Sequence, residues 1–337
     1  ELDLDVLRVQ EPNNAALRDL FVELEFRRLS DQFALAAQPP VGGTQGQASG
    51  EVEERENDYA IIDSVADVEL LAADLRAAGS FSIAAVSSHE DPLRGELVGL
   101  AFSVESGMAR YLPFAHTQPF ALTFEGEGSN ESRTLPGLGN PELDVLRDLL
   151  EDPTVGKSGH DLKQAALVLA TAGVALAGFD VDAMIASYVL DPGKRGHDLK
   201  ALSMEAFSHK PLDRSDVTGS GRSKVSFAEV PLERVSEYLC SAVDLAGRLA
   251  NHLAEKAEEA GLTKLLADLE MRLVPMLSRM ELSGIAIDDD FFQSMRGRLK
   301  RELDLIESDI FKLAGGEFNL NSTPQLRQIL FDKLEMP

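Results

Sequence analysis

Residues 97–114 read LVGLAFSVESGMARYLPF, and this stretch decides the fold. It contains two apolar runs of strand length, 97–104 and 108–114. Between them lies Ser106-Gly107, a dipeptide that is suited to a tight turn. The stretch therefore predicts two antiparallel strands joined as a β-hairpin.

The segments around this hairpin predict a mixed domain. Residues 59–62 and 81–86 are short apolar runs typical of strands, and residues 65–77 carry apolar side chains at helical spacing. The insert 123–140 is rich in Gly, Ser and Glu, which predicts an exposed loop. Helices are expected at 141–151, 161–173, 181–190 and 198–207, followed by a polar stretch over 213–224. Strands followed by helices indicate an α/β or α+β domain with a mixed sheet.

Both ends of the chain have a different pattern. Residues 14–37 predict a helix, and the Gly-, Gln- and Ser-rich residues that follow Pro39-Pro40 predict a flexible linker. This linker is the clearest domain boundary in the sequence. Beyond Pro231 the chain is expected to be almost wholly helical, with helices at 232–260, 263–283, 288–314 and 324–334.

Composition limits the class of protein. Among 337 residues there are 57 Asp and Glu against 32 Lys and Arg, a net charge of −25. This balance argues against a protein that only coats nucleic acid, because phosphate contacts require basic side chains. The single cysteine, Cys240, cannot form an internal disulfide, which suits a reducing cytoplasm. No run of residues is long and apolar enough for a membrane span, so we expect a soluble intracellular protein.

Common catalytic motifs are absent from the sequence. It has neither a GxxxxGK[ST] phosphate loop, nor a GxGxxG motif after a strand, nor a GxSxG nucleophile elbow. The six histidines show no metal-ligand spacing, and His116 and His160 are interpreted as surface or capping residues. Cys240 is interpreted as a small core residue inside a helix.

The order of the segments nevertheless resembles a known family. Residues 59–262 resemble the 3′–5′ exonuclease domain of bacterial family A DNA polymerases of the DNA polymerase I type. The resemblance rests on VGLAFSV-x-SGMARYLP at 98–113, FDVDAMIASYVLDP at 179–192 and HDLKALS at 197–203. It implies a ribonuclease H-like α/β fold with a mixed sheet, followed by long thumb helices.

The resemblance extends to both ends of the chain. Residues 263–337 resemble the base of the family's polymerase thumb, through LVPMLSRMELSGIAID at 273–288 and FNLNSTPQLRQILFDKL at 318–334. Residues 1–37 resemble the tail of a preceding 5′ nuclease region, and 38–58 form the linker. The family's palm and finger residues do not occur in this chain, so we expect no catalysis by this chain alone. The parent protein is expected to be a Mg²⁺-dependent DNA-directed DNA polymerase.

An active exonuclease of this family would hold two divalent cations with several carboxylates. The resemblance places those carboxylates at Ala84 and Val86 on a strand, Ala165 on a helix and Ala242 on a later helix. Only Tyr238, which would orient the attacking water, is kept. We therefore expect a catalytically dead domain that serves as a scaffold, with no metal site in this chain.

Two alternatives remain open at this point. Carboxylates near the lost positions could form a rearranged metal site in an active exonuclease; the candidates are Glu90, Asp91, Asp161, Asp182 and Asp244. Asp161 is expected to cap a helix, Asp182 is expected to cap a helix or to pair locally, and Asp244 is expected to point away from the site. The second alternative is an acidic module that binds another protein.

DNA contacts are expected in the least acidic part of the chain, residues 263–337. Asn319, Asn321, Ser322 and Thr323 match the family's DNA-contacting loop, and a helix that begins at Pro324 can be capped by the same residues. Arg296, Arg298, Lys300 and Arg301 can attract phosphates or pair with acids of their own helix. The expected partners are primer–template DNA and the rest of the polymerase. We expect a monomer in the bacterial cytoplasm, associated with the nucleoid and not with a membrane.

Overall fold

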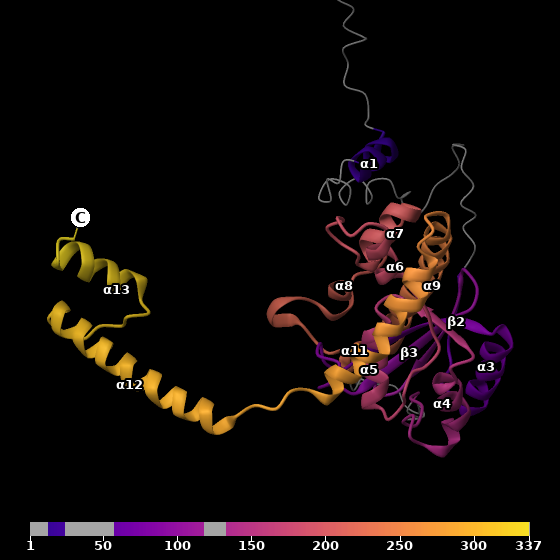
Figure 1. Ribbon diagram of the computed structural model, residues 1–337, viewed down its shortest axis with the longest axis horizontal. Coiled ribbons are helices and arrows are strands. Elements are labelled where there is room, and N and C mark those ends of the chain that lie inside the picture. The colour runs from indigo at the N-terminus through magenta and orange to yellow at the C-terminus, as the bar shows by residue number, and fades with distance from the viewer. Residues whose placement is uncertain (1–12, 24–56, 118–132, 337) are drawn as a thin grey trace, which may run out of the picture. The chain divides into compact units, whose positions relative to one another are not determined.

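The computed structural model describes residues 13–23, 57–117 and 133–336 (Figure 1). The chain divides into two compact units, which comprise residues 1–282 and 283–337. Most of the folded structure belongs to the larger unit.

The described part of the larger unit is built on a six-stranded mixed sheet with the strand order β1-β4-β3-β2-β5-β6. The pairs β2/β3 and β3/β4 are antiparallel, whereas β1/β4, β2/β5 and β5/β6 are parallel. The strands are β1 (Asp58–Ile61), β2 (Ser80–Ser87), β3 (Leu97–Ser103), β4 (Met108–Pro113), β5 (Gly156–Gly159) and β6 (Phe179–Asp182).

The hairpin predicted from residues 97–114 is confirmed. Strands β3 and β4 pair in the register Gly99↔Pro113 to Phe102↔Arg110. Strands β1 and β2 also lie where their apolar runs predict them, within one or two residues.

Strands β5 and β6 were not predicted. β5 reads Gly-Lys-Ser-Gly and has no apolar run, so its place in the sheet depends on backbone pairing with its two neighbours. The last two residues of β6 were interpreted as the start of a helix at 181. Asp182 instead has an extended backbone, and its side chain caps the helix that begins at Ala183. The helix prediction was therefore wrong at its first two residues.

Helices surround the sheet of the larger unit. Figure 1 shows α9 crossing the sheet on the side opposite to α3 and α4. Helix α8 lies in the stretch that was predicted only as polar. The helices are α1 (Asn14–Glu23), α3 (Val65–Ala78), α4 (Asp144–Glu151), α5 (Leu162–Thr171), α6 (Ala183–Leu190), α7 (Leu199–Phe207), α8 (Arg214–Thr218), α9 (Leu232–Glu259), α10 (Thr263–Leu265) and α11 (Met271–Ser283), with short turns η1 (Pro141–Leu143), η2 (Gly221–Ser223), η3 (Phe227–Glu229) and the π-helical η4 (Leu266–Glu270).

Alternation along β2 divides its side chains between two hydrophobic clusters. Phe81 and Ile83 belong to the first cluster, which also contains buried side chains of α3, α4 and α5. Val86 belongs to the second cluster, against which Ala84 packs and which contains buried side chains of α9. Successive side chains of a strand point to opposite faces, so β2 contributes to both clusters.

Segment boundaries differ from the predictions in two places. The larger unit continues to Leu282 and not to 262, because Leu266, Met271 and Val274 are buried in the first cluster. Asp58, predicted as the end of the linker, begins β1. Residues 38–56 of that linker and the predicted helix beyond Glu23 lie outside the described residues.

The predicted exposed loop 123–140 is anchored at its end. Residues 123–132 lie outside the described part of the chain. Leu135 and Leu138 are buried in the first cluster, so the loop prediction was wrong for 133–140. Two leucines among glycines give no periodic signal, which is why the sequence did not reveal this contact.

The smaller unit consists of α12 (Asp289–Ala314), α13 (Thr323–Arg327) and the π-helical turn η5 (Gln328–Lys333). Asp288 caps α12, as predicted, because its Oδ1 accepts from the Phe291 N–H at 2.9 Å. Gly315 ends α12 with a positive φ of 68°, a conformation that glycine adopts at little cost.

Candidate functional site

Strand β2 carries the first two positions that the sequence marked as lost metal ligands. The Val86 side chain is buried in the second cluster, and the half-buried Ala84 packs against the same cluster. Their surroundings are apolar side chains of the sheet and α9, including Val98, Val235 and Val243. Neither methyl nor isopropyl groups can ligate a cation, so this face of β2 offers hydrocarbon at these positions.

The other two lost positions lie on helices that pack against the same strand. Ala165 is buried on α5 and Ala242 is half-buried on α9, and both helices contact β2. The close approach of α9 to β2 is visible at Gly247, where a Cβ would come within 2.5 Å of the Ser82 Oγ. The fold thus packs the two helices that carry Ala165 and Ala242 against the strand that carries Ala84 and Val86.

Tyr238, the retained residue, lies in an aromatic stack beside the second cluster. Its ring is stacked on Phe227 of η3, with ring centres 5.6 Å apart and planes 22° apart. The Arg214 guanidinium lies over Phe227, 4.9 Å from the ring centre. Burial raises the pKa of Tyr238 above its usual value. Phe227 and Val217 are members of the second cluster, so α8 and η3 add to the hydrocarbon around Val86.

Asp161 and Asp182 act together at the start of two helices. Asp182 is fully buried, and its carboxylate accepts from the N–H groups of Asp161 at 3.1 Å, Leu162 at 2.7 Å and Met184 at 2.9 Å. Asp161 in turn caps α5 by accepting from Gln164 N–H at 3.3 Å. The capping roles predicted for both residues are confirmed. Burial raises the pKa of Asp182, whereas the three hydrogen bonds oppose that rise.

The remaining candidate acids also have structural partners. Asp244 is buried and accepts from Tyr59 Oη at 3.1 Å and Gly107 N–H at 3.0 Å, so it ties α9 to β1 and to the β3–β4 turn. Glu90 forms an ion pair with Lys224. Asp91 accepts from the Leu93 N–H at 3.0 Å in its own turn. Among the residues that the structure describes, no group of three His, Cys, Asp or Glu side chains could hold a metal ion.

The two histidines considered from sequence are partly buried and hydrogen-bonded. His116 Nε2 lies 2.6 Å from Tyr111 Oη, and burial lowers the pKa of His116. His160 Nε2 lies 2.8 Å from the backbone oxygen of His197. Both histidines thus keep part of their surface exposed while one ring nitrogen of each has a hydrogen-bond partner. Cys240 is buried in the second cluster as predicted, and burial raises the pKa of its thiol to about 12.

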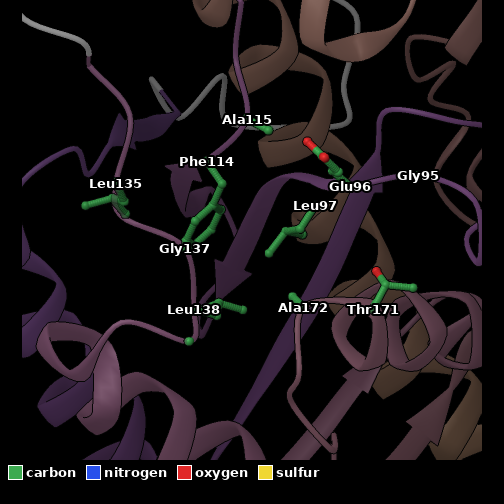
Figure 2. Close-up of a pocket in the computed structure, with 11 residues that line it drawn as sticks. Gly95, Glu96, Leu97, Phe114, Ala115, Leu135, Gly137, Leu138, Thr171 and Ala172 are labelled. Carbon is green, nitrogen blue, oxygen red and sulfur yellow. The ribbon is translucent and has the colours of Figure 1, made fainter.

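A cavity that sequence reasoning missed lies near the start of β3. Its volume is about 350 Å³, and its apolar lining includes Leu97, Phe114, Leu135 and Leu138. In Figure 2 the side chains of Leu97 and Phe114 point into the same space, whereas the Glu96 carboxylate points the other way. These four apolar residues belong to the first cluster, so the cavity is not part of the surroundings of Val86.

In the smaller unit, the expected DNA-contacting loop is a turn held by Asn319. The Asn319 N–H donates to Gln325 Oε1 at 2.8 Å, and Asn319 Oδ1 accepts from Asn321 N–H at 3.0 Å. Ser322 is the N-cap residue of α13, but its side chain makes no capping hydrogen bond. Asn321 and Thr323 are exposed. The turn therefore presents polar side chains to solvent just before a helix.

The basic residues predicted for DNA contact are exposed on α12. Arg298 Nε lies 4.0 Å from Glu302 Oε1, so the expected pairing within the helix occurs there. No ion pair involves Arg296, Lys300 or Arg301 in the described part of the chain. The same helix exposes large apolar side chains, including Leu303, and buries only Ala314. The smaller unit therefore buries few apolar side chains in a core of its own.

Comparison with known proteins agrees with this architecture. Residues 139–249 match the family profile described as DNA polymerase I, ribonuclease H-like domain. DNA polymerase I of Pseudomonas aeruginosa is 31% identical over an alignment that covers 100% of this chain and 36% of the relative. DNA polymerase I of Rhizobium leguminosarum is 32% identical, with 82% of this chain and 28% of the relative covered. The chain thus spans about a third of the length of these curated relatives.

A solved structure shares the fold. The POL domain of Pol1 from M. smegmatis, in complex with DNA primer-template and dNTP, superposes with a TM-score of 0.57 at 22% sequence identity. The superposition covers 82% of this chain and 41% of that one. Within the described residues, every helix is too short or too polar to cross a lipid bilayer. The chain is a DNA polymerase I-like protein, and its larger unit contains an exonuclease-like domain with a ribonuclease H-like fold.

Proposed function

We propose that this chain is part of a DNA polymerase I-type, DNA-directed DNA polymerase, and that its exonuclease-like domain is an inactive scaffold. The observation that carries the proposal is the apolar surroundings of Ala84 and Val86. The two-cation chemistry of such an exonuclease requires carboxylates that hold the metals. The residues present at the corresponding positions do not fit two cations, so we derive no hydrolytic step for this domain.

The alternative of a rearranged exonuclease site is not favoured by the contacts of the remaining acids. To bind a metal ion together, several carboxylates must each direct an oxygen at the position of that ion. The Asp182 carboxylate accepts from three backbone N–H groups, and the Asp244 carboxylate accepts from Tyr59 Oη and Gly107 N–H, so these bonds fix where both carboxylates point. Moving either carboxylate to a metal would leave buried donors without acceptors, at about 1–3 kcal/mol for each donor.

The proposal assigns DNA contact to the smaller unit. The exposed side chains of Asn321 and Thr323 and the N-terminus of α13 suit phosphate oxygens, since such groups position a backbone without reading sequence. Arg296 and Lys300 on α12 add positive charge. The parent polymerase would use Mg²⁺ in its polymerase part, and the exposed apolar side chains of α12 would pack on the rest of that protein. We further propose a monomer in the bacterial cytoplasm, at the nucleoid.

The inactive exonuclease is tested with a 5′-labelled single-stranded DNA. The chain 1–337 is incubated with this DNA in Mg²⁺ or Mn²⁺, with an active 3′–5′ exonuclease as the positive control. We expect the DNA to keep its full length. Shortening from the 3′ end would contradict the proposal if it is abolished by Asp161→Ala or Asp244→Ala, because a contaminating nuclease would be unaffected by these changes.

A further inference from the structure

A groove in the larger unit lies between α3 and the β3–β4 hairpin. Its volume is about 230 Å³, and its apolar lining consists of Leu71, Leu75, Phe102, Val104 and Met108, with Ala109. Leu75 and Phe102 are buried in the first cluster and form its floor. None of the residues discussed for metal or DNA contact lines this groove.

The rim of the groove exposes large apolar side chains. Leu70 on α3 is 66% exposed, and on the hairpin Val104 is 49% and Met108 40% exposed. Leu70 and Asp74 are four residues apart and so lie on the same face of α3. Exposed apolar side chains that gather around a cavity mark a contact surface more often than scattered ones do.

The charges around the groove are unbalanced. The one cation in the lining is Arg110, whose Nη2 already pairs with Asp58 Oδ2 at 2.7 Å. The lining also contains the exposed carboxylates of Asp74 and Glu105. In the described part of the chain neither carboxylate has an ion-pair partner. The groove therefore combines an apolar floor with two negative charges that lack a counter-charge.

We propose that this groove binds a basic amphipathic segment of another protein. One bulky apolar side chain of the segment enters between Leu71 and Met108, and flanking Lys or Arg side chains face Asp74 and Glu105. The cavity is smaller than the roughly 300–1,000 Å³ of typical small-molecule sites, and it suits the single anchor residue that dominates many interfaces. A second copy of this chain is a poor occupant, because two chains of net charge −25 repel each other.

The two parts of the surface have different roles in this interaction. The apolar floor supplies most of the affinity, since desolvated anchor side chains contribute most to binding. The carboxylates accelerate encounter and make binding sensitive to salt. This surface does not depend on the exonuclease-like domain being active or inactive.

The test uses the chain 1–337 and a fluorescein-labelled peptide of repeated Lys-Leu-Leu-Lys units, with fluorescence anisotropy as the readout. A matched peptide with Glu in place of Lys is the charge control. We expect Leu71→Gln/Met108→Gln to weaken binding about tenfold or more, as removal of an anchor contact does. We expect Asp74→Asn/Glu105→Gln to weaken binding at low salt and to reduce its salt dependence.

Matched variants elsewhere on the larger unit decide whether the site is the groove. Val145→Gln/Leu93→Gln removes two exposed apolar side chains, and Glu142→Gln/Asp148→Asn removes two exposed acids. Both should bind the Lys-containing peptide as the unchanged chain does, and thermal unfolding should show all four variants folded. Equal weakening by the control variants, or equal binding of the Glu-containing peptide, would overturn the proposal. So would a dimer in sedimentation that the groove variants dissociate, because the occupant would then be a second copy.

Discussion

Two regions of the larger unit differ in whether they contain a buried carboxylate. Around Ala84 and Val86, on one face of β2, the structure places mostly apolar side chains from the sheet, α8, α9 and η3, and no carboxylate belongs to this cluster. At the junction of β6 and α6, it buries the carboxylate of Asp182 completely. The difference lies in what compensates the charge. Three backbone N–H groups surround Asp182, whereas the polar side-chain atoms of the second cluster and its neighbours are tyrosine hydroxyls and the Cys240 thiol, which carry no positive charge to balance a carboxylate.

This comparison shows which acids a fold of this kind can keep without metal. A buried carboxylate is tolerated where helix N-termini supply hydrogen bonds, as at α5 and α6. Several carboxylates facing one another without a cation would repel and resist ionisation. Apolar residues at the predicted metal positions are therefore compatible with the proposal that this domain binds no metal.

The largest expected effect comes from placing a carboxylate in the apolar region. Val86→Glu should lower the free energy of unfolding by about 4 kcal/mol, because it buries a charge without a partner. Urea unfolding of the chain 1–337 measures it. Val145→Glu, at an exposed position of α4, is the control and should change stability by about 0.5 kcal/mol or less. A small effect of Val86→Glu, or its reversal by Mn²⁺, would show that this region accepts a metal ligand.

A somewhat smaller loss is expected when the retained carboxylate is removed. Asp182→Ala leaves three N–H groups without their acceptor and should cost about 3 kcal/mol in the same unfolding experiment. Asp180→Ala, at an exposed position two residues earlier on β6, should be nearly neutral. Equal effects of the two changes would mean that the hydrogen bonds of Asp182 do not stabilise the helix starts.

The smallest effect is expected in the smaller unit, where α12 carries both paired and unpaired cations. Arg296→Gln/Lys300→Gln should weaken binding of a labelled primer–template duplex by up to about tenfold and flatten its salt dependence. The control Arg298→Gln/Lys312→Gln has the same charge change, but it removes side chains that already pair with Glu302 and Asp309. If both variants reduce affinity equally, only overall charge matters and α12 makes no specific contact.

Much of the fold was predictable because its signals are local. The hairpin at 97–114 follows from two apolar runs and a Ser-Gly turn, and the caps at Asp161, Asp182 and Asp288 follow from residue type before a helix. β5 could not be predicted, because Gly-Lys-Ser-Gly becomes a strand only through its neighbours. The burial of Leu135 and Leu138 likewise depends on distant residues of the first cluster.

The candidate site, too, has one part that could be predicted from the sequence and one that could not. The absence of carboxylates at Ala84, Val86, Ala165 and Ala242 can be read from the sequence once the strand and helices are aligned with the family. The packing of Phe227 on Tyr238 could not be foreseen, since it joins a short turn to the second turn of α9. Nor could the contact between His116 and Tyr111, which depends on where the chain turns after β4.

The central claim is that no pair of cations binds where β2, α5 and α9 meet. The most direct measurement is anomalous X-ray diffraction from crystals of this chain soaked in Mn²⁺, with data collected near the manganese absorption edge. The account predicts no anomalous peak within ligand distance of residues 84, 86, 165, 238 or 242. Two neighbouring peaks there, held by side chains of this chain, would contradict it.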